Sequence, residues 1–150
     1  MPDDWPAEVL KAQAVAARSY ALATRKTAGD FDLYADVRSQ VYRGIDEEED
    51  STNQAVDDTS GEVLLYGGRV VTTYFHSTSG GRTASIADVW PGSNPVPYLV
   101  SVDDPYDSLS PHHVWGPVVV PAARLDRVLK TPGRLTGVRT SLNSSGRVDM

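Results

Sequence analysis

The sequence predicts an α+β fold in which a long, alanine-rich N-terminal helix packs on a mostly antiparallel β-sheet with long, cleft-forming loops. Three observations predict this class: an alanine-rich helical segment at residues 3–26, a hairpin pattern centred on Gly67 and Gly68, and further short strand patterns between proline- and glycine-rich loops. The 150 residues are 40% hydrophobic and 23% charged, which is typical of a globular protein. We therefore expect a single domain over residues 1–150.

The helical segment reads DDWPAEVLKAQAVAARSYALATRK, with acidic residues before Pro6 and basic residues near its end, and Gly29 follows it. Its alanines favour a thin helix, which we expect to be central and largely buried. Lys11 and Arg18 share one stripe at i+3/i+4 spacing, about 10 Å apart along the axis. By itself, this stripe is best explained as a solvated charged edge.

The strand patterns begin with EVLLY and RVVTTYFH, which flank the two glycines as a hairpin. Further strands are predicted at residues 97–102, within 114–130 ahead of a short amphipathic helix, and in a second hairpin at 134–150. A short capped helix is predicted at residues 51–61, with Gly61 as its stop.

Composition excludes several classes of protein. Twenty acidic against fourteen basic residues give a net charge of −6, which argues against duplex nucleic acid as a partner and against binding to a membrane surface through basic residues. The sequence contains no transmembrane run of apolar residues and no signal-peptide pattern at its start. Because there are no cysteines, disulfides and thiolate zinc sites are excluded.

The segment HSTSGGR, residues 76–82, combines hydroxyl groups, glycines and a histidine, but no Gly-Lys-Ser/Thr of a phosphate-binding loop follows. His76 and Ser77 would point to opposite faces of a strand, so they cannot pair as base and nucleophile. A pairing of His76 with Ser79 stays open, although the G-x-S-x-G motif of many hydrolases is absent. No metal site is indicated, because the other two histidines are adjacent in a proline-rich loop.

Hydroxyl and backbone N–H groups near aromatic residues suit a sugar, whose hydroxyls bind polar groups and whose ring lies on an aromatic face. The aromatic residues are Tyr74, Phe75, Trp90 and Tyr98. A surface loop beside structural aromatics explains the same pattern equally well.

Six blocks then occur in a characteristic order: PAEVLKAQAVAARSYAL, SQVYRG, NQAVDDTSGEVLLYGG, YFHSTSGGRT, DVWPG and PYLVSVDDP. Together they cover residues 2–105 and resemble the SpoIID/LytB family of sporulation stage II protein D and amidase enhancers. The resemblance implies a protein located outside the cytoplasm, in the cell wall or anchored to the membrane, that acts on peptidoglycan. One branch of the family consists of lytic transglycosylases that cleave peptide-stripped glycan strands, and the other enhances or modifies cell-wall amidases.

The resemblance also implies roles for particular residues. Lys11 and Arg18 fall on basic positions of the family's active-site helix, where they support the catalytic acid and orient the sugar. The loop after the hairpin would line the same cleft as substrate-binding residues: His76, Ser77, Thr78, Ser79, Gly80, Gly81 and Arg82. The implied partners are peptidoglycan glycan strands and, for the enhancer branch, a cell-wall amidase. No cofactor or metal is expected.

The sequence departs from the family's pattern at both ends. The family's catalytic glutamate directly precedes the Met-Pro that opens this chain, and its C-terminal glycine-rich motif has no counterpart before Met150. We therefore expect a chain truncated at both ends, with impaired catalysis, because a lytic transglycosylase can depend on a single carboxyl group. We expect no rescue by Asp3, Asp4 or Glu8. The alternatives are a non-catalytic glycan-binding or amidase-enhancing module and the remnant of a split gene.

Overall fold

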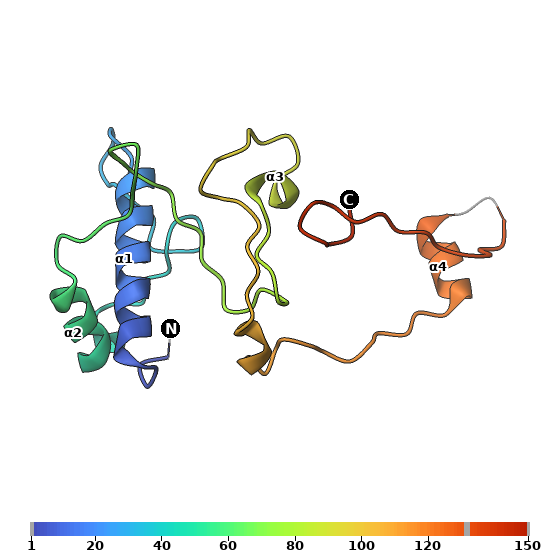
Figure 1. Ribbon diagram of the computed structural model, residues 1–150, viewed down its shortest axis with the longest axis horizontal. Coiled ribbons are helices and arrows are strands. Elements are labelled where there is room, and N and C mark those ends of the chain that lie inside the picture. Colours follow the sequence, from blue (N-terminus) through green and yellow to red (C-terminus); the bar gives the residue numbers. More distant parts are fainter. Residues whose placement is uncertain (1, 131–132, 150) are drawn as a thin grey trace. The chain divides into compact units, whose positions relative to one another are not determined.

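A computed structural model describes residues 2–130 and 133–149 (Figure 1). The chain divides into two compact units, residues 1–75 and 76–150, which are described one at a time. The predicted α+β class is confirmed, since helices occur together with a small antiparallel sheet. In chain order the elements are α1 (Ala7–Thr24), η1 (Ile45–Glu47), α2 (Asp50–Asp58), β1 (Leu65–Tyr66), β2 (Arg69–Val70), α3 (Ile86–Val89), η2 (Asp107–Leu109) and α4 (Ala122–Leu129).

The first unit is built around α1, which confirms the predicted N-terminal helix. Pro6 precedes its first residue, and the Pro6 carbonyl accepts the N–H groups of Val9 and Leu10. Proline suits this place because it has no N–H to leave unsatisfied. However, only Leu10 and Ser19 of α1 are buried, so the helix is less covered than we expected.

Helix α2 packs against α1, and both helices are seen side by side in Figure 1. The predicted short helix is therefore confirmed, and Gly61 follows it with a φ of 78°, a conformation that glycine adopts without strain. Leu10 of α1, Ala55 of α2 and Val71 are the buried apolar residues in the described part of this unit.

The first hairpin forms, but its strands are much shorter than predicted. Leu65 pairs with Val70 and Tyr66 with Arg69, around two glycines that both have positive φ. The flanking polar groups bond to α1 instead of to a longer ladder. The hydroxyl of Ser19 accepts the N–H of Leu64, and the Thr73 hydroxyl donates to the carbonyl of Ala16. The helix thus replaces the neighbouring strands that a larger sheet would supply.

The second unit contains isolated bridges where the sequence predicted strands. Arg82 bridges Asp103 in antiparallel fashion, and the Thr83 N–H donates to the Val102 carbonyl. The strand predicted at residues 97–102 does not form, because residues 97–99 lie in a turn that the bond from the Leu99 N–H to the Val96 carbonyl closes. The second predicted hairpin is reduced to a bridge between Leu142 and Val148, and its Met150 lies outside the described residues.

The remaining elements of the second unit are short helices. Helix α4 confirms the predicted amphipathic helix, but the strand expected ahead of it does not form. Ser85 caps α3 by accepting the N–H of Asp88 at 3.2 Å. The hydroxyl of Ser145, a buried residue, accepts the Ser85 N–H and donates to the Asp88 carboxylate, which joins α3 to the turn at residues 143–146. Among the helices in the described ranges, none has the length and apolar character needed to cross a membrane.

Ser19→Ala is expected to lower the free energy of unfolding by about 1–3 kcal/mol, because it leaves the Leu64 N–H without its acceptor. Ser19 is fully buried, so water cannot replace the lost hydroxyl. Urea unfolding of the chain measures the change, with the exposed Ser60→Ala as the control. Equal effects of the two substitutions would contradict this account of α1.

Candidate functional site

Lys11 lies between two carboxylates on the exposed side of the contact between α1 and α2. Its Nζ is 3.0 Å from Asp58 Oδ2 and 3.5 Å from Glu8 Oε1. The hydrogen bond to Asp58 raises the pKa of Lys11, and the charges of Asp58 and Glu8 add to this effect. The same hydrogen bond lowers the pKa of Asp58, with support from Gln54. Lys11 is therefore a fixed positive charge at neutral pH.

Arg18 binds the end of α2. Its guanidinium donates to the carbonyl of Thr59 at 2.7 Å, of Glu62 at 2.9 Å and of Val56 at 3.1 Å. The last carbonyls of a helix have no partners within the helix and carry its negative dipole end. Arg18 satisfies the Val56 carbonyl in the last turn of α2 and the Thr59 and Glu62 carbonyls just beyond it, and in doing so it fixes α2 to α1. The sequence indicated a charged stripe but gave no sign of this attachment.

A hollow of about 500 Å³ lies between α1 and the end of α2. Glu8, Lys11 and Val15 line it from the α1 side, and Asp58, Thr59 and Glu62 line the other side. We call it the α1–α2 groove. Its volume is within the range of sites for small ligands, and its carboxylates and ammonium group can bond the hydroxyl groups of a polyol.

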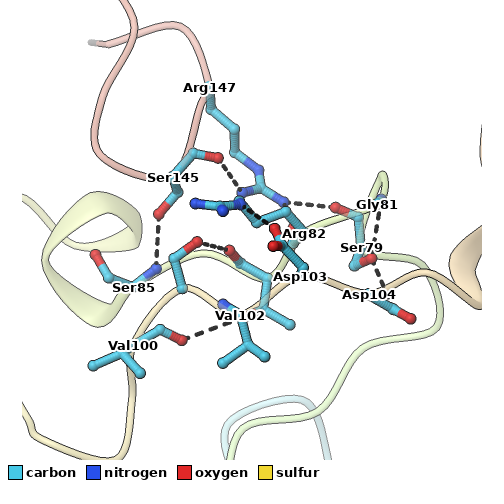
Figure 2. Close-up of polar contacts among 12 residues, drawn as sticks. Ser79, Gly81, Arg82, Ser85, Val100, Val102, Asp103, Asp104, Ser145 and Arg147 are labelled. Carbon is cyan, nitrogen blue, oxygen red and sulfur yellow. Dashed lines mark hydrogen bonds and ion pairs between the residues drawn. The ribbon is translucent and has the colours of Figure 1, made fainter.

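The loop at residues 76–82 belongs to the second unit, where Ser79 anchors it. The Ser79 hydroxyl donates to Asp104 Oδ2 at 2.9 Å and accepts the N–H of Gly81, while the Ser79 N–H donates to Asp107. Figure 2 shows the bonds to Asp104 and Gly81. The hydroxyl of Ser79 is thus engaged with Asp104, and the structure gives no bond between it and His76 that would support a nucleophile and base.

Arg147 holds the same loop through its carbonyl groups. One guanidinium nitrogen, Nη2, donates to the carbonyls of Ser79 and Arg82, each at 2.6 Å (Figure 2). The side chain of Arg82 pairs with Asp103 at 2.7 Å, and the hydroxyls of Thr78 and Ser110 bond to each other. These contacts leave His76, Ser77, Gly80 and Arg82 exposed to solvent, whereas Ser79 is buried.

Sequence reasoning missed the pair formed by Asp107 and His113. The Asp107 side chain is 2% exposed, and its carboxylate receives the Ser79 N–H and contacts His113 Nδ1. The hydrogen bond from His113 is the largest of the effects that lower the pKa of Asp107 to about 2, against the opposing effect of burial. In the sequence, the only sign of this pair is that a histidine follows an aspartate by six residues. No regular element was predicted over this segment, so the spacing did not predict a contact.

Lys11 and Arg18 lie in the first unit and residues 76–82 in the second, so the prediction that both line one cleft stays a prediction. Over residues 2–130 and 133–149, no three His, Asp or Glu side chains are grouped so as to hold a metal ion.

Comparison with known proteins identifies the chain's family. The sequence model of the stage II sporulation protein family, SpoIID, matches residues 1–66. The amidase enhancer of Bacillus subtilis is 41% identical over 108 residues, which is 71% of this chain and 14% of that protein. The stage II sporulation protein D of the same organism is 30% identical over 130 residues, 75% of this chain and 37% of that protein. This chain belongs to the SpoIID family.

The resemblance to SpoIID/LytB proteins that the six sequence blocks indicated is therefore confirmed. An uncharacterized protein of Brachyspira hyodysenteriae is a further relative, 45% identical over 105 residues, 68% of this chain and 28% of that protein. The chain thus spans well under half the length of these SpoIID relatives.

Arg18→Lys is expected to lower the free energy of unfolding by about 1–2 kcal/mol, because one ammonium group cannot span three separate carbonyls. Arg25→Lys, just beyond the end of the same helix at an exposed position, is the matched control. Urea unfolding compares the two variants with the unsubstituted chain. No difference between them would show that Arg18 does not hold α2.

The stability of the second unit is expected to depend on the charge of Asp107. Its pKa of about 2 in the folded chain lies below its ordinary value of 3.8, so the unfolded chain binds the proton more tightly. The stabilisation is present above pH 3.8 and is lost as the pH falls toward 2. The difference in melting temperature between the unsubstituted chain and Asp107→Asn should therefore shrink over this range. The exposed Asp30→Asn serves as the control, and a difference independent of pH would contradict the assignment.

Proposed function

We propose that this chain is a peptidoglycan-acting domain of a cell-wall protein and that it holds a glycan strand. The observation that carries the proposal is its membership of the SpoIID family, which includes relatives named for sporulation and for enhancing an amidase. The chemistry of the described surfaces supports it, because both the α1–α2 groove and the loop at residues 76–82 present hydrogen-bonding groups suited to sugar hydroxyls.

The proposed reaction is the lytic cleavage of peptide-stripped glycan strands. An acid protonates the glycosidic oxygen, the bond from that oxygen to the muramic acid C1 breaks, and the sugar's own C6 hydroxyl attacks C1 and gives up its proton. One carboxyl group can perform both proton transfers, unlike the two required when water is the acceptor. The resemblance places that carboxyl directly before Met1, outside these 150 residues. The described residues then serve to hold the substrate and orient the acid.

The structure suggests different tasks for the two basic residues of α1. Lys11 keeps its positive charge between two carboxylates, so it can stabilise a further carboxylate or bond a sugar hydroxyl in the groove. Arg18 is engaged with three carbonyls, so we propose that it supports the site by fixing the α1–α2 contact rather than by touching the sugar.

A second candidate is a non-catalytic module that binds glycan and assists a cell-wall amidase. The relative named amidase enhancer, which is 41% identical, favours it. Either function places the protein where peptidoglycan is, outside the cytoplasm.

Product analysis separates the two candidates. Peptide-stripped glycan strands are incubated with the 150 residues, and with a longer version that includes the glutamate that the resemblance places before Met1. Mass spectrometry then detects anhydro-muramic ends. The lytic function predicts such ends with the longer version and strand binding alone with the 150 residues. If the longer version binds strands without producing these ends, the enzyme proposal fails and the binding module is favoured.

The loop's part in binding is tested by replacing the exposed side chains of His76 and Ser77. His76→Ala combined with Ser77→Ala is expected to weaken binding to peptide-stripped strands about 5- to 150-fold, because about two net hydrogen bonds are lost. His112→Ala, an exposed histidine outside the loop, should leave the affinity unchanged. Equal affinities for all three proteins would exclude this loop from the glycan site.

A further inference from the structure

His113 is held in one orientation by a carboxylate that is almost completely removed from solvent. The Asp107 side chain is 2% exposed, and one of its oxygens contacts His113 Nδ1 while the other accepts the Ser79 N–H. The backbone also positions the histidine, since its N–H donates to the Ser110 carbonyl at 3.1 Å. Burying a charged carboxylate lowers the stability of the fold unless its oxygens accept hydrogen bonds. In Asp107, one oxygen is bonded to the histidine and the other to the 76–82 loop.

This contact determines which ring nitrogen of His113 carries the proton. An ionised carboxylate can only accept hydrogen bonds, and the pKa of Asp107, lowered to about 2, keeps it ionised at neutral pH. The neutral imidazole must therefore bear its hydrogen on Nδ1, which leaves the lone pair on Nε2. The ring is 33% exposed, and within the described part of the chain no group bonds to Nε2.

The surroundings of the ring indicate the kind of group that Nε2 accepts. The Cε1 edge of His113 lies beside Gly81, 3.8 Å from where a Cβ would be, so the histidine borders the 76–82 loop. The charged groups at the loop already have partners: Asp103 pairs with Arg82, Asp104 accepts from the Ser79 hydroxyl, and Arg147 donates to the carbonyls of the loop. None of these groups is needed to bind a charged ligand, and a neutral acceptor such as Nε2 suits an uncharged hydroxyl donor.

Two exposed aromatic rings flank the pair in sequence. Tyr106 directly precedes Asp107 and is 76% exposed, and Trp115 follows His113 by two residues and is 79% exposed. Such rings are surfaces on which the apolar face of a pyranose can lie.

We propose that His113 is a glycan-binding residue whose Nε2 accepts a hydrogen bond from an uncharged sugar hydroxyl. Asp107 is the positioning residue that fixes the ring and its tautomer. This inference rests on the proposed glycan-binding function and extends it from the 76–82 loop to the segment that holds that loop. Because Asp107 already holds the ring in one orientation, binding a sugar does not incur the loss of conformational entropy that ordering a mobile side chain would cause.

Binding to peptide-stripped glycan strands provides the first test. His113→Gln is expected to weaken the affinity about 3- to 10-fold through loss of the aligned acceptor, and the neighbouring His112→Gln is expected to leave it unchanged. If the unsubstituted chain binds strands and both variants bind equally well, this inference fails while the proposed function stands. If the unsubstituted chain does not bind strands, the proposed function fails and the inference with it.

Nitrogen-15 resonances of the imidazole rings provide a test that needs no substitution. At neutral pH, His113 should show hydrogen on Nδ1, and adding peptide-stripped strands should shift its Nε2 resonance without shifting that of His112. The proposal would be overturned if His113 carried its hydrogen on Nε2, or if its Nε2 resonance did not shift at a saturating concentration of strands.

Asp107→Asn tests the positioning role. The asparagine oxygen can still accept the Ser79 N–H, which turns the amide nitrogen toward His113 Nδ1. A donor at this place should move the ring hydrogen to Nε2 and weaken strand binding about 3- to 10-fold. A folded variant that retains hydrogen on Nδ1 would show that Asp107 does not set the tautomer.

Discussion

The described structure depends on polar bonds between side chains and backbone, because its apolar core is very small. Among residues 2–130 and 133–149, Leu10, Ala55 and Val71 are the buried hydrophobic residues, whereas most of the large apolar side chains are exposed. Hydrophobic burial alone cannot then hold the connecting segments in place. Their carbonyl and N–H groups are held instead by Arg18 and Ser19 in the first unit, and by Asp107 and Arg147 in the second.

This way of holding loops shapes the candidate sites. A loop fixed through its backbone keeps some of its side chains for contacts with a ligand. Residues 76–82 illustrate this, because the carbonyls of Ser79 and Arg82 are bound by Arg147 while His76 and Ser77 remain exposed. In the first unit, Arg18 holds the backbone carbonyls of Thr59 and Glu62, two residues that line the α1–α2 groove, and Lys11 lines the groove from α1.

The sequence predicted α1, α2 and α4, because local rules determine them, but it gave no sign of the one-turn helices α3, η1 and η2. Alanine content and Pro6 placed the start of α1 to within one residue, and the paired glycines at the first hairpin both have the positive φ that such a turn requires. Strands were overestimated, because an alternating pattern reveals that a segment is extended but not whether a partner strand lies beside it. At residues 97–102 even the extended conformation is interrupted, since residues 97–99 form a turn and the isolated bridge lies at Asp103.

The candidate site was predictable only in part, for a related reason. The stripe containing Lys11 and Arg18 follows from helical spacing, but the attachment of Arg18 to carbonyls 38 to 44 residues away depends on how α2 packs. Asp107 and His113 were missed because their relation to the 76–82 loop is made entirely by tertiary contacts. The family resemblance supplied roles that neither spacing nor composition could give.

The bonds from Arg147 to the carbonyls of the 76–82 loop join two segments that are synthesised at different times. Arg147 follows Ser79 by 68 residues, so the loop leaves the ribosome well before the side chain that fixes its carbonyls. Closing such a long segment costs entropy that is recovered only when the final contact forms. During synthesis, the bonds that fix this loop can therefore form only after residue 147 has been made.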